Sequence, residues 1–331
     1  MDNRITKKRL SDFLAYEWIM LLVVIVAAIV VLELVFTVSA ARLTAGQEFK
    51  YYYDINLYEP YGDGNTFYDV LGVDLSENGK TFSYDVLKVD TETLNESYDV
   101  LSVRLSVREG DAIFTSSYED AEKGVQSRAK TLIDGYSVYD FERLLSDAKS
   151  YLSGFTVDGG DIYSVDDYDT EKIAKHFDER MKKDNRFRTE EQKAAGRILE
   201  TERIKTLALN TRDFEKILTV GKEKGLFFTY TKYEQTMATT DKKEQYEKAY
   251  ERELAERKDA IYGLNLNALT YSATAENKKD ASRYFKLSGN DTAENVVLLV
   301  FDFLKEQPDL QFETISFIDT IVRTFSDILD A

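Results

Sequence analysis

The chain offers few side chains that could carry catalysis or hold a metal ion. Its 331 residues include no cysteine and one histidine, His176, which lies in a run of charged residues. A thiolate or histidine-rich metal site therefore cannot be built, and a Ser-His-Asp site would depend on His176 alone. We interpret His176 as a solvated or half-buried residue of a polar helix. We predict no catalytic residue, no metal, no cofactor and no enzymatic activity.

Five aspartates lie in the segment 158–169 (DGGDIYSVDDYD), and carboxylates interspersed with glycines can hold calcium. Their spacing does not match the Asp-x-Asp-x-Asp-Gly loop that ends in a glutamate, so we predict a solvated loop. Asp161 and Asp167 could pair for acid–base catalysis, but they are no better placed for it than other carboxylates of this acidic chain.

The balance of charge excludes one class of partner. The net charge is −17, and it belongs to the part of the chain after residue 41, because the first 41 residues contain equal numbers of acidic and basic side chains. Such an acidic body repels phosphate backbones, so we expect no nucleic-acid partner. The lack of cysteine also removes the acylated anchor of bacterial lipoproteins, so a membrane tether must be part of the polypeptide itself.

The segment 18–41 (WIMLLVVIVAAIVVLELVFTVSAA) is apolar over a length that could cross a bilayer. Basic residues precede it and only Arg42 follows closely, which predicts that residues 1–17 are cytoplasmic and residues 42–331 extracellular. We predict a single-pass signal anchor in the cell membrane. The alternative is a signal peptide cleaved after Ala40, but the length of the apolar run favours the anchor.

One acidic residue, Glu33, interrupts this apolar segment. A charge well inside a membrane helix costs about 2–3 kcal/mol on insertion scales. One interpretation is that Glu33 contacts the helix of a partner membrane protein. The other is that it is protonated and tolerated near the middle of a strongly apolar helix.

A phrase that begins Tyr-Asp-Val-Leu occurs three times, from Tyr68, Tyr84 and Tyr98, at unequal offsets that exclude a repeat array. The first two copies flank an Asn-Gly turn signal, which predicts a pair of strands. The third could follow a helix cap at Asn95 and stop at Gly110, but its apolar residues also alternate as in a strand. We predict a helix for this copy, for a reason given by the resemblance described below.

Other segments give clearer predictions. We expect strands at 48–58, 111–116 and 226–230, and helices at 139–152, within 170–217 and at 240–260, so that 170–260 is a charged helical region with solvated faces. A capping box at 291–294 predicts a helix over VVLLVFDFL, and Pro308 is expected to open the last helix.

Three segments resemble extracellular solute-binding proteins of bacterial ABC importers. They are YDVLSVRLSVREGDAIFTSS (98–117), DGYSVYDFERLLSDAKSYL (134–152) and QPDLQFETISFIDTIVRTFSDIL (307–329). The resemblance implies an α/β fold of the type II periplasmic-binding-protein kind, reduced or divergent. It also implies that the third copy is a helix that feeds a strand whose carboxyl end faces the ligand. The anchor cysteine and a tryptophan in the extracellular part, which many such proteins have, are missing.

Two hypotheses of function follow. In the first, the protein is a membrane-anchored solute-binding-like protein that serves nutrient import beside permease subunits of an ABC importer. Ligands of open α/β sheets bind at the carboxyl ends of strands, which points to Thr115, Ser116 and Ser117. A carbohydrate ligand would depend on tyrosines, for which Tyr118, Tyr136 and Tyr139 are candidates. In the second, the protein is a tethered interaction or assembly protein with no small-molecule ligand.

Overall fold

The computed structural model describes residues 18–39, 46–57, 81–94, 98–231, 259–272, 278–286, 295–304 and 307–329, with the single residues 7, 11, 43 and 67. The chain divides into two compact units, Met1–Thr44 and Ala45–Ala331.

Helix α2 (Trp18–Ser39) is the main element of the first unit. Side chains are described for residues 22–32 of this helix. Among the residues that the structure describes, no helix combines the length and the apolar character needed to cross a membrane. The side chain of Glu33 lies outside the described part, so its contact with a partner helix stays a prediction.

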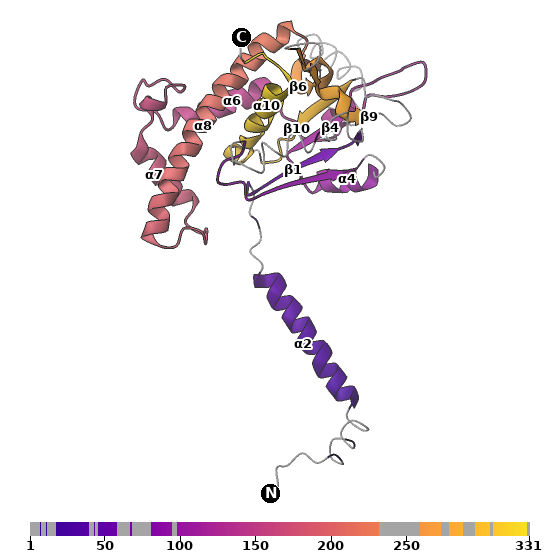
Figure 1. Ribbon diagram of the computed structural model, residues 1–331, viewed down its shortest axis with the longest axis vertical. Coiled ribbons are helices and arrows are strands. Elements are labelled where there is room, and N and C mark those ends of the chain that lie inside the picture. Colours follow the sequence, from indigo (N-terminus) through magenta and orange to yellow (C-terminus); the bar gives the residue numbers. More distant parts are fainter. Residues whose placement is uncertain are drawn as a thin grey trace, which may run out of the picture. The chain divides into compact units, whose positions relative to one another are not determined.

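The second unit is an α/β domain around a mixed sheet of six strands in the order β3-β1-β4-β10-β6-β5 (Figure 1). Strands β3, β1 and β4 are parallel, whereas β10 runs antiparallel to both of its neighbours and β5 antiparallel to β6. The α/β class predicted from the sequence is therefore confirmed. The bounds are β1 Glu48–Tyr53, β3 Lys88–Thr93, β4 Ala112–Ser116, β5 Phe227–Tyr230, β6 Ala260–Asn265 and β10 Val296–Val300.

Helices cover both faces of this sheet, which explains why strand β1 is buried along most of its length. Phe49, Tyr51 and Tyr53 point to one face and Tyr52 to the other, as the period of two requires. The first face packs against α6 (Phe141–Ser153), α8 (Glu190–Glu223) and α10 (Glu313–Phe325). The second packs against α4 (Tyr98–Ser106) and α5 (Arg128–Gly135).

The third copy of the repeated phrase forms α4, as predicted, and connects β3 to the parallel strand β4. The helix stops where Arg108 and Gly110 adopt positive φ values of 59° and 104°. A Cβ atom on Gly110 would lie 2.3 Å from Cε2 of Tyr52, so only glycine fits this turn. The second copy is a strand only from Lys88, in β3, and pairs with β1. The first copy lies outside the described residues.

The predicted helix over VVLLVFDFL is wrong, because this segment contains the central strand β10. Every residue of β10 is buried, with Val296, Leu298 and Val300 on one face and Val297 and Leu299 on the other. A short, continuous apolar run fits a strand buried on both faces, and its length, not its periodicity, separates it from a helix.

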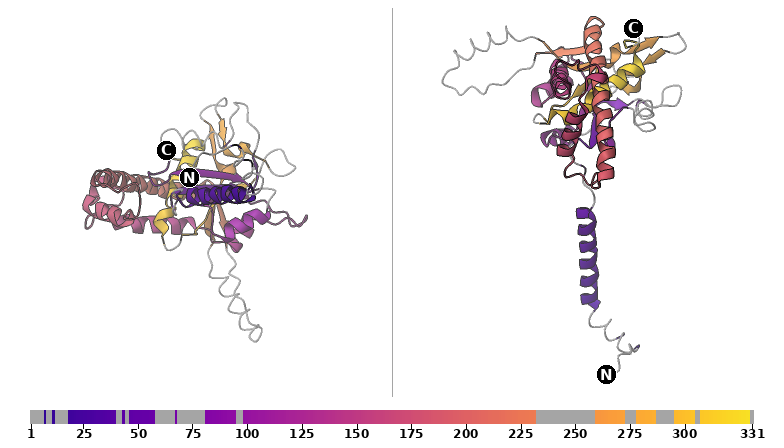
Figure 2. Two further views of the ribbon diagram at one scale, coloured as in Figure 1. Left: turned by 90° about the horizontal axis from the view of Figure 1, so that it is seen from below. Right: turned by 90° about the vertical axis from the view of Figure 1, so that its left-hand side faces the viewer.

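The charged region contains α7 (Thr170–Arg180) and the 34-residue helix α8, as predicted. The two helices pack side by side, and α7 with the first half of α8 extends beyond the sheet (Figure 2). Thr189 and Gln192 form the capping box at the start of α8. The predicted helix at 240–260 lies outside the described residues apart from 259–260, and residue 260 begins β6.

The predicted strands at 48–58, 111–116 and 226–230 correspond to β1, β4 and β5, with the short β2 (Asn56–Leu57) completing the first segment. Strand β2 pairs with β9 (Phe285–Lys286), and β7 (Thr270–Ser272) with β8 (Lys278–Asp280). Pro308 opens a 3₁₀ turn, η5 (Pro308–Gln311), directly before the last helix α10. The described residues also form the 3₁₀ turns η1 (Val165–Asp167), η3 (Leu266–Ala268) and η4 (Ala281–Tyr284).

Candidate functional site

The polar residues predicted at the carboxyl end of β4 lie together. The hydroxyl of the first of them, Thr115, is engaged in a hydrogen bond within the protein. Thr115 is buried and donates a hydrogen bond to Asp54, which follows β1 (3.0 Å). Arg128 of α5 pairs with the same carboxylate at 2.7 Å. The Thr115–Asp54 hydrogen bond joins the ends of β1 and β4. Ser117 donates to the carbonyl of Asn295 at 3.0 Å and so fastens the end of β10.

The remaining residues predicted to contact a ligand lie in different parts of the domain. Ser116 accepts the backbone N–H of Tyr118, whose hydroxyl donates to Asp120 (3.1 Å in each case). Tyr139 is buried and donates to Asp147 at 2.9 Å, and Tyr136 packs against the core on the opposite face of the sheet. None of the six residues lines either of the two cavities described below. Their role in ligand binding stays a prediction.

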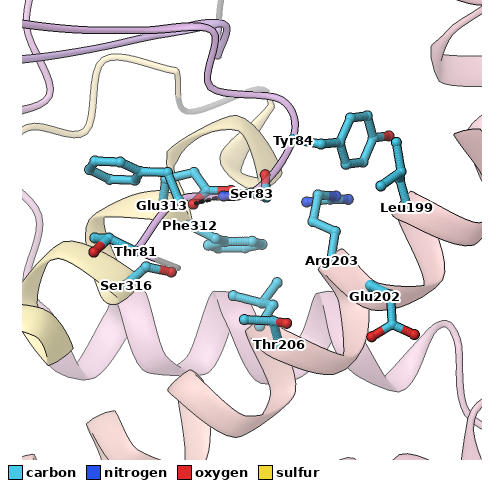
Figure 3. Close-up of a pocket in the computed structure, with 12 residues that line it drawn as sticks. Thr81, Ser83, Tyr84, Leu199, Glu202, Arg203, Thr206, Phe312, Glu313 and Ser316 are labelled. Carbon is cyan, nitrogen blue, oxygen red and sulfur yellow. Dashed lines mark hydrogen bonds between the residues drawn. The ribbon is translucent and has the colours of Figure 1, made fainter. Parts of the chain in front are cut away.

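The larger cavity has a volume of about 470 Å³ and lies between α8, α10 and the segment 81–84 that precedes β3 (Figure 3). Its walls combine apolar side chains with hydroxyls, carboxylates and one guanidinium group. The lining residues are Thr81, Phe82, Ser83, Tyr84, Leu199, Glu202, Arg203, Thr206, Leu207, Phe312, Glu313 and Ser316.

Glu313, the first residue of α10, fixes segment 81–84 to the cavity wall. Its carboxylate accepts the backbone N–H of Ser83 at 3.1 Å (Figure 3). Burial raises the pKa of Glu313, and the hydrogen bonding from Ser83 opposes this shift. The ionised form of the Glu313 carboxyl group would therefore be stabilised by a hydrogen-bond donor or a positive charge placed beside it.

Arg203 reaches the cavity from α8, where it is held by Glu200 one helical turn earlier. Its Nε and Nη2 donate to the two carboxylate oxygens of Glu200 at 3.0 and 2.9 Å, and Nη2 also donates to the hydroxyl of Tyr151 at 2.6 Å. Arg203 is 6% exposed and Glu200 0%. Such a bidentate pair fixes the plane of the guanidinium group.

A second arginine completes a buried ionic network around Glu200. Arg180 of α7 donates to Glu200 and to Asp85, each at 2.5 Å, and Tyr84 donates to Glu200 at 2.7 Å. Asp85 also lies 3.6 Å from Nε of Arg203. Burial alone would raise the pKa of Glu200, but the two arginines lower it to about 2. The guanidinium groups of Arg180 and Arg203 and the carboxylates of Glu200 and Asp85 thus neutralise one another beside the cavity.

His176 lies at the margin of this network and not in the cavity. Its Nε2 is 3.1 Å from the hydroxyl of Tyr151 and 3.8 Å from Glu200. Burial is the main cause that lowers the pKa of His176. The residue is half-buried, which agrees with the structural interpretation drawn from the sequence.

Two other places gather polar groups, the smaller cavity and the aspartate-rich loop 158–169. The smaller cavity, about 330 Å³ between α7 and α8, has charged walls that pair with each other, as Arg197 does with Asp178 at 2.8 Å. In the aspartate-rich loop, the carboxylate of Asp167 accepts the N–H of Asp161 at 2.9 Å. Within the described residues, no group of three or more His, Cys, Asp or Glu side chains could hold a metal ion.

Sequence reasoning missed every residue of the larger cavity. Glu200 and Arg203 were included among the solvated charges of the helical region, but they are buried. A usable signal was present: at a spacing of three residues, they lie on the same helix face as Ile204, Leu207 and Phe214. Charges of opposite sign on an apolar helix face indicate a buried pair.

Comparison of the chain with family models, curated protein sequences and solved structures found no match.

Proposed function

We propose that this protein is a membrane-anchored, extracellular solute-binding-like protein that holds a small molecule in the cavity between α8 and α10 and serves a bacterial nutrient importer. The cavity carries this proposal. Its volume of about 470 Å³ lies in the range of small-molecule sites, roughly 300–1,000 Å³. Such sites combine apolar walls with a few fixed polar groups, which is the composition found here.

The polar groups of the cavity are held in place before any ligand arrives. The Glu200 carboxylate fixes Arg203, and the Ser83 backbone is bound to Glu313. Groups that are already ordered do not lose further conformational entropy on binding, which favours affinity. This arrangement suits a binding protein, and we assign it no catalytic step.

The finer fold assignment, a reduced or divergent type II periplasmic-binding-protein-like domain, is part of the proposal. The unit β3–α4–β4, with an acidic glycine turn between helix and strand, supports it because the resemblance implied this order. Ala45–Ala331 is one compact unit, so we place the ligand in a cavity of that unit and not between two lobes.

The anchor and its orientation rest on the sequence, through the apolar segment 18–41 and the basic residues before it. Alkaline extraction of membranes separates proteins that are embedded in the bilayer from those that are not. We expect the full chain to remain in the membrane pellet and protease added to intact cells without a wall to digest residues 42–331. Release by alkali would refute the anchor.

A thermal-shift screen of the full chain in detergent tests the binding function, with sugars, oligosaccharides, peptides and amino acids as ligands. A ligand present at 100 times its Kd adds about 2.7 kcal/mol of stability, which raises the melting temperature visibly. Thr206→Trp, which fills the cavity from α8, should abolish the shift. Thr219→Trp is the matched control, because Thr219 is exposed on the same helix and outside the cavity.

A second candidate function is the tethered assembly protein, and one surface favours it. Val100 and Val103 of α4 are 42% and 63% exposed, and Val107, directly after the end of the helix, is 67% exposed. Their spacing of three and four residues places them on one side. The partner in this case is a permease subunit of the importer. A photo-crosslinker at Val103 should capture that subunit in cells, whereas one at Val157, an exposed loop valine, should not. Binding of no ligand in the screen, combined with this crosslink, would replace the solute-binding function by the assembly role.

A further inference from the structure

The cavity contains two groups of opposite chemistry that reach the same space. Arg203 lies on the α8 side and Glu313 on the α10 side, and in the view of Figure 3 the ring of Phe312 is drawn between them. Phe82 and Leu207 add further apolar surface, and both are buried. The cavity therefore presents a donor, an acidic acceptor and an apolar wall.

The hydrogen-bond donors of Arg203 that are not bound to the described part of the protein indicate one part of the ligand. Within the part of the chain that the structure describes, its hydrogen bonds use Nε and Nη2, so Nη1 remains for an acceptor on the ligand. Guanidinium N–H groups bind carboxylates through charge-assisted hydrogen bonds. Because Glu200 already balances the charge of Arg203, a ligand carboxylate alone would not neutralise the cavity.

The acidic side chains of the cavity indicate the second part of the ligand. Among the described residues that line the cavity, Arg203 is the one basic side chain beside the acidic Glu313 and Glu202. The Glu313 carboxylate accepts Ser83 and has lone pairs for additional donors. A ligand ammonium group beside Glu313 would supply both the missing positive charge and N–H donors.

From this juxtaposition, and resting on the proposed binding function, we infer that the ligand is a free α-amino acid with a large apolar side chain. Its carboxylate bonds to Nη1 of Arg203 and its ammonium group to Glu313. Its side chain packs on Phe312, Phe82 and Leu207. A neutral sugar would leave the carboxylate of Glu313 without a positive partner, so this class fits less well.

The test uses the full chain in detergent and three probes that share a phenylethylamine skeleton: L-phenylalanine, N-acetyl-L-phenylalanine and 2-phenylethylamine. We expect L-phenylalanine to bind, and the other two to bind at least about tenfold more weakly because each lacks one charged contact. Glu313→Gln, which keeps an acceptor for the N–H of Ser83, should weaken the binding of L-phenylalanine by a similar factor. It should leave the affinity for N-acetyl-L-phenylalanine unchanged, because that probe has no ammonium group.

The outcomes separate this inference from the proposed function. Equal binding of all three probes, or an unchanged affinity in Glu313→Gln, would overturn the amino-acid class. A sugar or peptide whose binding is lost in Thr206→Trp, without binding of L-phenylalanine, would also overturn the class while leaving the cavity as the binding site. Loss of binding in Thr219→Trp as well as Thr206→Trp would count against the cavity itself.

Discussion

Glu200 and Arg203 form a bidentate ion pair on the buried face of α8, with N–O distances of 3.0 and 2.9 Å. Arg203 lines the cavity and Glu200 does not, and their pairing determines where the guanidinium group can point. Removing two charges from water is costly, and a buried pair is retained where its geometry is good and further hydrogen bonds satisfy it. Here Tyr84, Tyr151 and Arg180 supply those bonds.

Glu200→Gln should destabilise the folded protein strongly. The substitution leaves Arg180 and Arg203 with one carboxylate, Asp85, and breaking a buried ion network in this way costs about 3–5 kcal/mol. Glu202→Gln, two residues further along and exposed, should change stability by less than about 0.5 kcal/mol. Urea unfolding of both variants measures the difference. Equal stability of the two would mean that the network is not formed as described.

Asp111 predicts a dependence of stability on pH. Burial raises its pKa to about 7, above the ordinary value of 3.8. The folded state therefore holds this proton more tightly than the unfolded state does. The contribution of Asp111 to the free energy of unfolding is complete below pH 3.8 and is lost as the pH rises through 7. Asp111→Asn, which keeps an acceptor for the N–H of Lys50, should gain stability relative to wild type between pH 5 and 8. A difference between Asp111→Asn and wild type that does not change with pH would contradict the burial of this carboxyl group.

The contact between α7 and α8 requires a glycine. A Cβ atom on Gly196 would lie 2.2 Å from Cζ of Phe177 and 2.8 Å from Cδ1 of Phe187. Gly196→Ala should therefore destabilise the protein by about 1–3 kcal/mol through overpacking, despite the better helix propensity of alanine. Gly135→Ala at the end of α5 meets nothing within 4 Å and serves as the control. A melting temperature of Gly196→Ala at or above that of wild type would contradict the packing.

The sequence predicted most of the fold where the pattern of apolar residues was regular. Helix α6 was found because its apolar residues recur on one face, and β4 because a short apolar run ends in serines. Strand β10 was missed because it lies between β4 and β6 in the sheet and has both of its faces buried in the two cores, so it shows no alternation. A capping signal at Asp291 then weighed wrongly for a helix.

The cavity could not be predicted from the sequence, because its groups come from three segments far apart in the chain. Ser83 and Glu313 are separated by 230 residues and meet through one hydrogen bond. Only the Glu200 and Arg203 pair left a local trace, as two charges on an apolar helix face. The strand-end residues were found by a rule of sheet topology, and the structure places Thr115 against Asp54 and Arg128.

Serine substitutions separate the two locations for a ligand. Ser117→Ala removes a hydroxyl at the end of β4 that bonds to the carbonyl of Asn295. If the cavity is the site, ligand affinity should stay within about twofold, because Ser117 does not line it. Ser316→Ala removes a hydroxyl that does line it and should weaken binding by about threefold to tenfold. Isothermal titration of both variants decides, and the reverse order would move the site to the strand ends.

The most direct measurement is the equilibrium Kd of the ligand found by the screen, compared among wild type, Thr206→Trp and Thr219→Trp. We predict that Thr206→Trp weakens binding by more than about tenfold, because a displaced ligand loses more than about 1.4 kcal/mol of contact, while Thr219→Trp matches wild type. Equal Kd values for all three proteins would show that the ligand binds elsewhere and would contradict the cavity between α8 and α10 as the binding site.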